Sequence, residues 1–98
     1  MLFEVKFKKY SFKKLQKILK KNPNLKDKID TAYEKLKNNP FDITLGTHKV
    51  NSKKFGLKYS SSITGDLRFI WDFDTENLKI KIIQIFDIGG HSGVDGVY

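Results

Sequence analysis

Two neighbouring segments in the second half of the chain constrain the fold most strongly, because both have the residue pattern of β-strands. In residues 67–73, large apolar side chains occupy every second position and so share one face of a strand. After a short loop at residues 74–77, residues 78–88 return as a second strand, whose later half, residues 82–88, is largely apolar on both faces. A strand buried on both faces lies inside a sheet. We therefore expect an antiparallel hairpin within a larger sheet.

The first part of the chain is predicted to contain one strand and two amphipathic helices. Residues 2–7 alternate between apolar and charged side chains, which predicts a half-buried strand. Apolar residues recur at helical spacing in residues 12–21 and 25–37, on either side of a helix-breaking Asn-Pro-Asn sequence. Ser11 is expected to cap the first helix, and one of those asparagines the second. The side chains expected to face the sheet are Phe12, Leu15, Ile18 and Leu19 in the first helix and Leu25, Ile29, Ala32 and Leu36 in the second.

The middle of the chain is predicted to supply the remaining strands. Residues 41–47 have little pattern and indicate a connection, and residues 48–51 indicate a short strand. Residues 55–63 form a weakly alternating strand, whose serines at 60–62 we expect to be too polar for a deep core. This order predicts one α+β domain over residues 1–98, with the N-terminal strand and helical hairpin packed on a mainly antiparallel sheet of about four to five strands.

The chain is strongly basic. Its 19 lysine and arginine residues exceed its 11 acidic residues, which gives a net charge of +8 and a pI near 9.7. Such a charge favours a polyanionic partner such as RNA, although lysines on helix faces are often only solvated. Twelve of the lysines lie in residues 1–37, mostly on the two predicted helices. We expect the helical hairpin to present a basic outer surface.

The composition also indicates a cellular compartment. The chain has no cysteine, so a disulfide framework or a thiolate metal site is not available. No apolar run approaches the ~18 residues of a membrane span, and charged residues occur too early for a signal peptide. We expect a cytoplasmic protein without membrane association.

Arg68 is the single arginine among the 19 basic residues. It lies on the strand face opposite Leu67, Phe69 and Trp71. Because a guanidinium presents paired donors to phosphate oxygens, Arg68 is a candidate phosphate clamp. The alternative is a structural ion pair, for example with Asp87 on the neighbouring strand.

His48 and His91 both adjoin the end of a predicted strand and are candidates for acid and base chemistry. Two imidazoles and a cation suffice to cleave RNA without a metal, because one accepts the 2′-hydroxyl proton and the other protonates the leaving 5′-oxygen. Each histidine taken singly is more often an ordinary surface residue. No metal-ligand spacing, phosphate-binding loop or dinucleotide fingerprint is present, so we expect no metal and no cofactor. Tyr98 is a candidate base-stacking residue or a cover for the core edge.

Several parts of the chain together carry a family resemblance. They are the N-terminal strand with its lysine-rich helical hairpin, residues 47–50, 56–63 and 65–73, and the closing residues 87–93 with Val97 and Tyr98. In this order and spacing they resemble the RelE-type toxins of bacterial and archaeal toxin–antitoxin pairs, within the RelE/ParE superfamily. The resemblance implies a RelE-like, microbial-RNase-like fold and metal-independent cleavage of mRNA, typically in the ribosomal A site. It also implies a cognate antitoxin as protein partner.

The resemblance implies a role for each matching residue. His91 is similar to the histidine that several members use as general acid or base, and Arg68 is similar to their phosphate-stabilising arginine. His48 and Asp66 match site positions of the YafQ-like branch. The substrate contacts implied by the resemblance are Lys49, Lys58, Ser62 and Tyr98.

Two departures from the YafQ-like branch leave other functions open. Ser62 stands where that branch has a further histidine, and Leu67 stands where it has a tryptophan. One alternative is a ParE-like toxin that binds a protein target and cleaves no RNA. Another is a basic RNA-binding module, or a toxin homologue that has lost catalysis.

Overall fold

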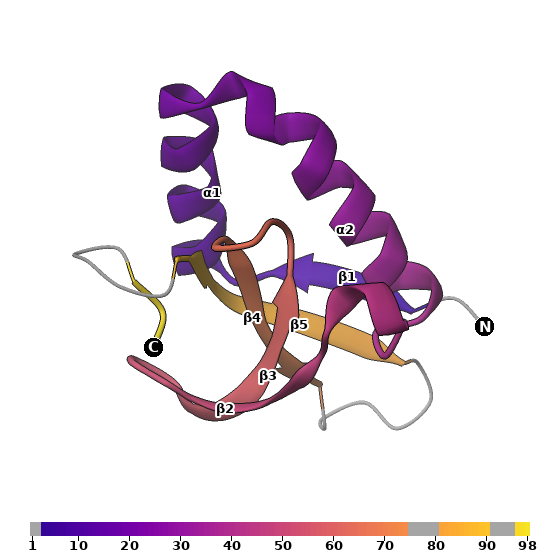
Figure 1. Cartoon of the computed structure of the whole chain (residues 1–98). Coiled ribbons are helices and arrows are strands. Elements are labelled where there is room, and N and C mark those ends of the chain that lie inside the picture. The colour runs from indigo at the N-terminus through magenta and orange to yellow at the C-terminus, as the bar shows by residue number, and fades with distance from the viewer. Residues whose placement is uncertain (1–2, 75–80, 91–95) are drawn as a thin grey trace.

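The computed structural model describes residues 3–74, 81–90 and 96–98, which form a five-stranded sheet and two α-helices. Residue 2 of the first predicted strand and residues 78–80 of the last lie outside the described residues. The predicted α+β class is confirmed (Figure 1). In chain order the elements are β1 (Glu4–Phe7), α1 (Lys9–Lys21), η1 (Pro23–Leu25), α2 (Lys26–Asn38), η2 (Ile43–Leu45), β2 (His48–Ser52), β3 (Gly56–Ser62), β4 (Arg68–Phe73) and β5 (Ile82–Gly89).

The sheet has the strand order β1-β5-β4-β3-β2. β1 pairs in parallel with β5, and the other three pairs are antiparallel, as the sequence pattern predicts. β5 lies between β1 and β4. This interior position agrees with the largely apolar sequence of residues 82–88, because six of the eight residues of β5 are buried and Gln84 and Phe86 are partly exposed.

Both helices cover one face of the sheet, which confirms the predicted layer arrangement (Figure 1). The apolar stripes of the helices meet the alternate side chains of β4 and β5 in one core. Its buried members are Val5, Leu15, Ile29, Ala32, Leu36, Leu45, Phe69, Trp71, Ile83, Ile85 and Ile88. The opposite face of the sheet is therefore left for the C-terminal segment and the candidate site.

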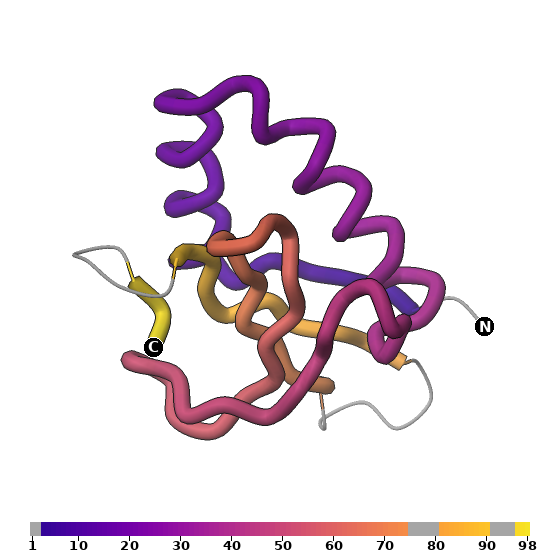
Figure 2. The backbone as a smooth tube through the Cα atoms, viewed as in Figure 1, coloured from indigo at the N-terminus to yellow at the C-terminus, as the bar shows by residue number. Residues whose placement is uncertain are grey.

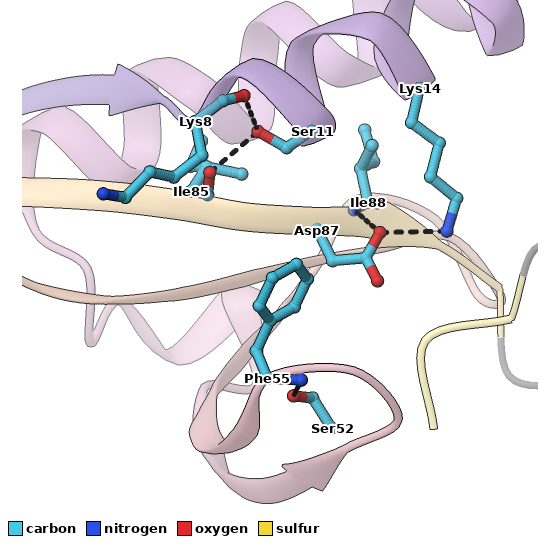
Figure 3. Close-up of polar contacts among 8 residues, drawn as sticks. All are labelled: Lys8, Ser11, Lys14, Ser52, Phe55, Ile85, Asp87 and Ile88. Carbon is cyan, nitrogen blue, oxygen red and sulfur yellow. Dashed lines mark hydrogen bonds and ion pairs between the residues drawn. The ribbon is translucent and has the colours of Figure 1, made fainter.

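The start of α1 differs from the prediction. The helix begins at Lys9, so Ser11 lies in its first turn and is not its cap. Ser11 is fully buried, and its hydroxyl lies within hydrogen-bond distance of the carbonyl oxygens of Lys8 (2.8 Å) and Ile85 (2.7 Å) (Figure 3). Phe12, which was expected to face the sheet, is 47% exposed. The buried face of α1 contains Ser11 and Leu15, four residues apart, and the hydrogen bond from Ser11 to Ile85 turns this face toward β5.

Both long connections contain a short 3-10 helix. Neither asparagine of the Asn-Pro-Asn sequence caps α2, because η1 intervenes and the helix begins after Leu25 without a side-chain cap. In the connection at residues 41–47, Asp42 caps η2 by accepting a hydrogen bond from the Thr44 N–H (2.9 Å). Hydrogen bonds from the Thr44 side chain and backbone hold the pKa of Asp42 below its usual value.

A β-bulge in β5 changes which of its side chains face the helices. The register of β5 against β4 shifts in the middle of the strand pair, so β5 carries one extra residue. Ile85 and Ile88 are three residues apart, yet both lie in the core. Between them, Phe86 is partly buried and Asp87 is buried opposite Ile70 of β4. The bulge therefore directs a carboxylate away from the core.

Candidate functional site

The sheet face turned away from the helices, here called the open face, brings together most of the polar residues singled out from the sequence. The register pairs His48 with Ser60 and Ser62 with Arg68. Since alternate residues of a strand share a face, these four side chains lie on the same side of β2, β3 and β4. Other strand residues of the open face include Val50, Ser52, Lys58, Ile70, Asp72, Gln84, Phe86 and Asp87.

Arg68 has no ion pair among the described residues. Its guanidinium is half-buried at the start of β4, and its Nε is buried without a hydrogen-bond partner. Asp87, the partner considered from the sequence, instead bonds through Oδ1 to Lys14 Nζ at 2.9 Å (Figure 3). The alternative prediction, a structural ion pair between Arg68 and Asp87, is therefore wrong. A fixed cation with an unsatisfied donor is ready to bind an anion, because a buried N–H without an acceptor is costly.

Residues 96–98 lie beside the turn between β2 and β3 (Figure 2). The Val97 N–H donates to the carbonyl of Gly90 (3.0 Å), and the Val97 carbonyl accepts from the Lys53 N–H (2.7 Å). The Tyr98 hydroxyl then lies 2.5 Å from Ser60 Oγ. Tyr98 thus reaches the middle of the open face, where its phenol oxygen adjoins the strand position that pairs with His48.

Ser60 and Ser61 correct the expectation that these serines are too polar for the interior, because both are fully buried. Ser60 bonds to Tyr98 on the open face. On the helix side, Ser61 Oγ accepts from Trp71 Nε1 (2.7 Å) and lies 2.6 Å from Thr47 Oγ1. Hydrogen bonding removes the cost of burying a hydroxyl. Sequence reasoning did not single out Ser60, although its position opposite His48 follows once the register is known.

Asp66 lies in the turn between β3 and β4 and contacts the end of β5. A Cβ atom on Gly90 would lie 2.5 Å from Asp66 Oδ2, so a larger residue at position 90 would force the carboxylate to move. Gly89, the preceding residue, pairs with Arg68. Asp66 and Arg68 therefore both adjoin the strand end that leads to His91. His91 itself lies outside the described residues, and its role stays a prediction.

His48 is exposed at the start of β2, the edge strand of the sheet. Its Nδ1 lies 2.9 Å from the Gly46 carbonyl. Because a carbonyl oxygen only accepts hydrogen bonds, we assign the proton to Nδ1, which leaves Nε2 available to exchange a proton with a ligand.

The predicted substrate contacts do not all lie on the open face. Lys49 is next to His48 in the strand and so points to the other side, where its ammonium lies 4.3 Å from the centre of the Tyr59 ring. Lys58 is on the open face, 3.7 Å from Asp72 Oδ2. Ser62 is beside Arg68, and its hydroxyl donates to the Thr64 carbonyl (2.7 Å). Of the four predicted substrate contacts, Lys49 is therefore the one that does not point to the open face.

Comparison with solved structures identifies the fold. The YoeB/ParE toxin from Agrobacterium tumefaciens superposes with a TM-score of 0.70 and 13% identity, covering 92% of this chain and 100% of the toxin. The archaeal RelE–RelB complex from Pyrococcus horikoshii OT3 gives a TM-score of 0.68 and 22% identity, covering 94% of this chain and 98% of the matched chain. The chain has the RelE/ParE toxin fold. The RelE-like fold expected from the sequence is confirmed.

The sequence comparisons do not extend this result. No protein-family model matches the chain, and no curated protein matches it. The RelE/ParE similarity is therefore one of fold, shared by chains that differ at most positions. In residues 3–74, 81–90 and 96–98, no helix is long and apolar enough to cross a membrane. The same residues contain no cluster of three or more potential metal ligands.

Proposed function

We propose that this protein is the toxin of a toxin–antitoxin pair and that it cleaves mRNA, on the ribosome and without a metal. The observation that carries the proposal is Arg68, a half-buried arginine on the open face with no ion pair among the described residues and an unsatisfied Nε. A partly buried charge that serves only the fold is usually paired. The fold, the net charge of +8 and the likeness to two toxin structures support the same conclusion.

The proposed chemistry is attack of a ribose 2′-hydroxyl on the adjacent phosphorus. A general base removes the 2′-hydroxyl proton, the 2′-oxygen bonds to phosphorus, and a general acid protonates the departing 5′-oxygen. His91 and His48 are the candidates for these proton transfers. Asp66, beside the end of β5, is a candidate to orient one of these groups or to supply a negative charge near them. Arg68 stabilises the negative charge that develops on the phosphate oxygens. The products are a 2′,3′-cyclic phosphate and a 5′-hydroxyl.

The proposed partners are mRNA in the ribosomal A site and a cognate antitoxin in the same cytoplasm. The RelE structure to which this chain is similar was solved as a RelE–RelB complex. The chain's excess of lysine over acidic residues suits an antitoxin that is at least partly acidic. We expect such a protein to be encoded next to this one. Co-purification with the product of the adjacent reading frame tests this part of the proposal.

The decisive experiment is cleavage of a ribosome-bound mRNA, mapped by primer extension, for the wild type, Arg68→Ala and His91→Ala. Loss of a charge-stabilising group at a phosphate is expected to slow cleavage by about 10²- to 10³-fold. Lys17→Ala, on the exposed part of α1, is the matched loss of one positive charge and should cut normally. Unchanged cutting by both site variants would show that the site is wrong. Intact mRNA together with gyrase poisoning would favour a ParE-like toxin instead.

A further inference from the structure

A cluster of three aromatic side chains joins Phe86 of the open face to Phe55 and to Tyr10 of α1, and is here called the ring cluster. Its members come from three separate parts of the chain, namely the first turn of α1, the turn between β2 and β3, and the bulge of β5. The Tyr10 and Phe55 ring centres are 5.8 Å apart, and those of Phe55 and Phe86 are 5.6 Å apart. Figure 3 shows Phe55 projecting from the turn toward β5. The cluster exists only because the bulge removes Phe86 from the core.

The ring cluster is surrounded by lysines. Lys8 and Lys58 place their ammonium groups 5.4 Å and 4.8 Å from the centre of the Phe86 ring. Lys54 lies 4.7 Å from the centre of the Tyr10 ring. Tyr10 is 39% exposed, and the other two rings are partly buried. The ring of Tyr10 is thus reachable from solvent, and the rings of Tyr10 and Phe86 each lie beside a lysine ammonium group.

The acidic groups near the ring cluster do not cancel this charge. Asp87 is 1% exposed, and its Oδ1 accepts from Lys14. Asp72 lies 3.7 Å from Lys58 and is the other described carboxylate in an ion pair there. Hydrogen bonding with Tyr10 raises the pKa of Lys54, with a smaller contribution from the charge of Asp87, so this ammonium stays charged at neutral pH. The cluster therefore combines apolar ring faces with net positive charge.

We propose that the ring cluster is a binding surface for single-stranded RNA, in which an unpaired base stacks on Tyr10 or Phe55 and the neighbouring phosphates bind Lys8, Lys54 and Lys58. Without RNA, the lysines lie over the rings. With RNA, a base takes the place on the ring face and the ammonium groups move to the phosphates. This inference rests on RNA being the substrate, as proposed above.

The position of the ring cluster relative to Arg68 suits one continuous strand of RNA. Phe86 is three residues from Gly89, which pairs with Arg68, and that separation is about 10 Å along β5. A strand held at Arg68 by its scissile phosphate therefore reaches the rings with a flanking nucleotide. The ring cluster is expected to contribute to affinity and to the choice of nucleotides beside the cut, and not to the proton transfers.

The test measures binding of a fluorescent single-stranded RNA to the full chain by anisotropy. The RNA is 2′-O-methylated, so it cannot be cut by 2′-hydroxyl attack. Tyr10→Leu and Phe55→Leu keep an apolar side chain but remove the ring, and each should weaken binding by about 5- to 150-fold. Tyr10→Phe and Phe55→Trp keep a ring and should bind within about twofold of wild type. Binding of double-stranded RNA, whose bases are not free to stack, should not distinguish these variants.

Phe12→Leu is the matched control, because Phe12 is an exposed phenylalanine of α1 outside the ring cluster. It should bind RNA like the wild type, and circular dichroism on heating checks that every variant folds. Wild-type affinity in both ring-cluster leucine variants overturns the proposal. The proposal is also overturned if Tyr10→Phe and Phe55→Trp lose as much affinity as the leucine variants, because both keep a ring and the ring would then not be the feature that binds RNA.

The outcome also separates this inference from the proposed nuclease. If the leucine variants lose RNA affinity while the wild type fails to cut mRNA on ribosomes, the RNA surface stands and the nuclease proposal falls. If the wild type cuts mRNA and the leucine variants bind and cut as it does, the nuclease proposal stands and the RNA surface falls.

Discussion

Lys14 Nζ lies 2.9 Å from Asp87 Oδ1, and this contact between α1 and β5 leaves Arg68 without the carboxylate partner nearest to it in the sheet register. The side chains are 10% and 1% exposed, so the pair is almost completely removed from water. Asp87 Oδ1 also accepts from the Ile88 N–H, while Oδ2 has no partner. The ion pair thus occupies the Asp87 carboxylate, so the Arg68 guanidinium stays available to bind an anion.

Removing Lys14 should destabilise the protein strongly. Lys14→Met leaves Asp87 buried and unpaired, and we expect the free energy of unfolding to fall by about 3–5 kcal/mol. Urea denaturation measures the change. Lys17→Met, which removes an exposed lysine of the same helix, should change it by less than about 0.5 kcal/mol. A Lys14→Met effect as small as that of the control would mean that the pair contributes nothing to folding.

Arg68 should behave as a functional residue and not as a structural one. Arg68→Met removes a guanidinium that makes no ion pair with any described residue and a buried Nε that has no acceptor, so the free energy of unfolding should not fall by more than about 1 kcal/mol. Cleavage of mRNA should nevertheless be lost. Denaturation and primer extension on the same preparation give both values. A loss of stability of several kcal/mol would identify Arg68 as structural.

Gly90→Ala should affect activity more than stability. The new Cβ would lie 2.5 Å from Asp66 Oδ2, which must move, and a carboxylate at the end of an exposed side chain moves at little cost. We expect slower mRNA cleavage with the free energy of unfolding within about 1 kcal/mol of wild type. Gly65→Ala is the control, because a Cβ there has nothing within 4 Å. Equal cleavage by both variants would argue against a role for Asp66.

The contact between Ser60 and Tyr98 should hold the C-terminal residues on the open face. Tyr98→Phe leaves the buried Ser60 hydroxyl without its described partner, and we expect a cost of about 1–2 kcal/mol in the free energy of unfolding. Adding Ser60→Ala should recover most of that loss, since neither group then needs a hydrogen bond. The double-mutant cycle, measured in urea, gives the coupling energy. Strictly additive effects would contradict a direct interaction.

Salt dependence should report the phosphate contacts of the ring cluster. For single strands, the slope of log affinity against log salt changes by about 0.7 for each phosphate neutralised. Lys8→Gln and Lys54→Gln should therefore each lower the slope by about 0.7 in the anisotropy titration. Lys28→Gln, on α2, should leave the slope as in the wild type. Identical slopes in all four proteins would show that these lysines do not contact phosphate.

The local pattern of the sequence was enough to predict most of the framework. Alternation in residues 67–73, the apolar run at residues 82–88 and helical spacing in residues 12–21 and 25–37 correspond to β4, β5, α1 and α2. Periodicity succeeds because it records which side of an element is buried, and that depends only on nearby residues. The same rule could have separated Lys49 from His48, since adjacent residues of a strand point to opposite faces.

Other features depend on contacts between segments that lie far apart in the sequence. A bulge cannot be read from a run of apolar residues, so the sequence did not indicate that Phe86 leaves the core or that Asp87 pairs with Lys14. The burial of Ser60 depends on a hydrogen bond to Tyr98, 38 residues away. The main helices and strands, the basic charge and the lone arginine could be read from the sequence. The packing of α1 against β5 pairs Asp87 with Lys14, and it leaves Arg68 without an ion pair among the described residues.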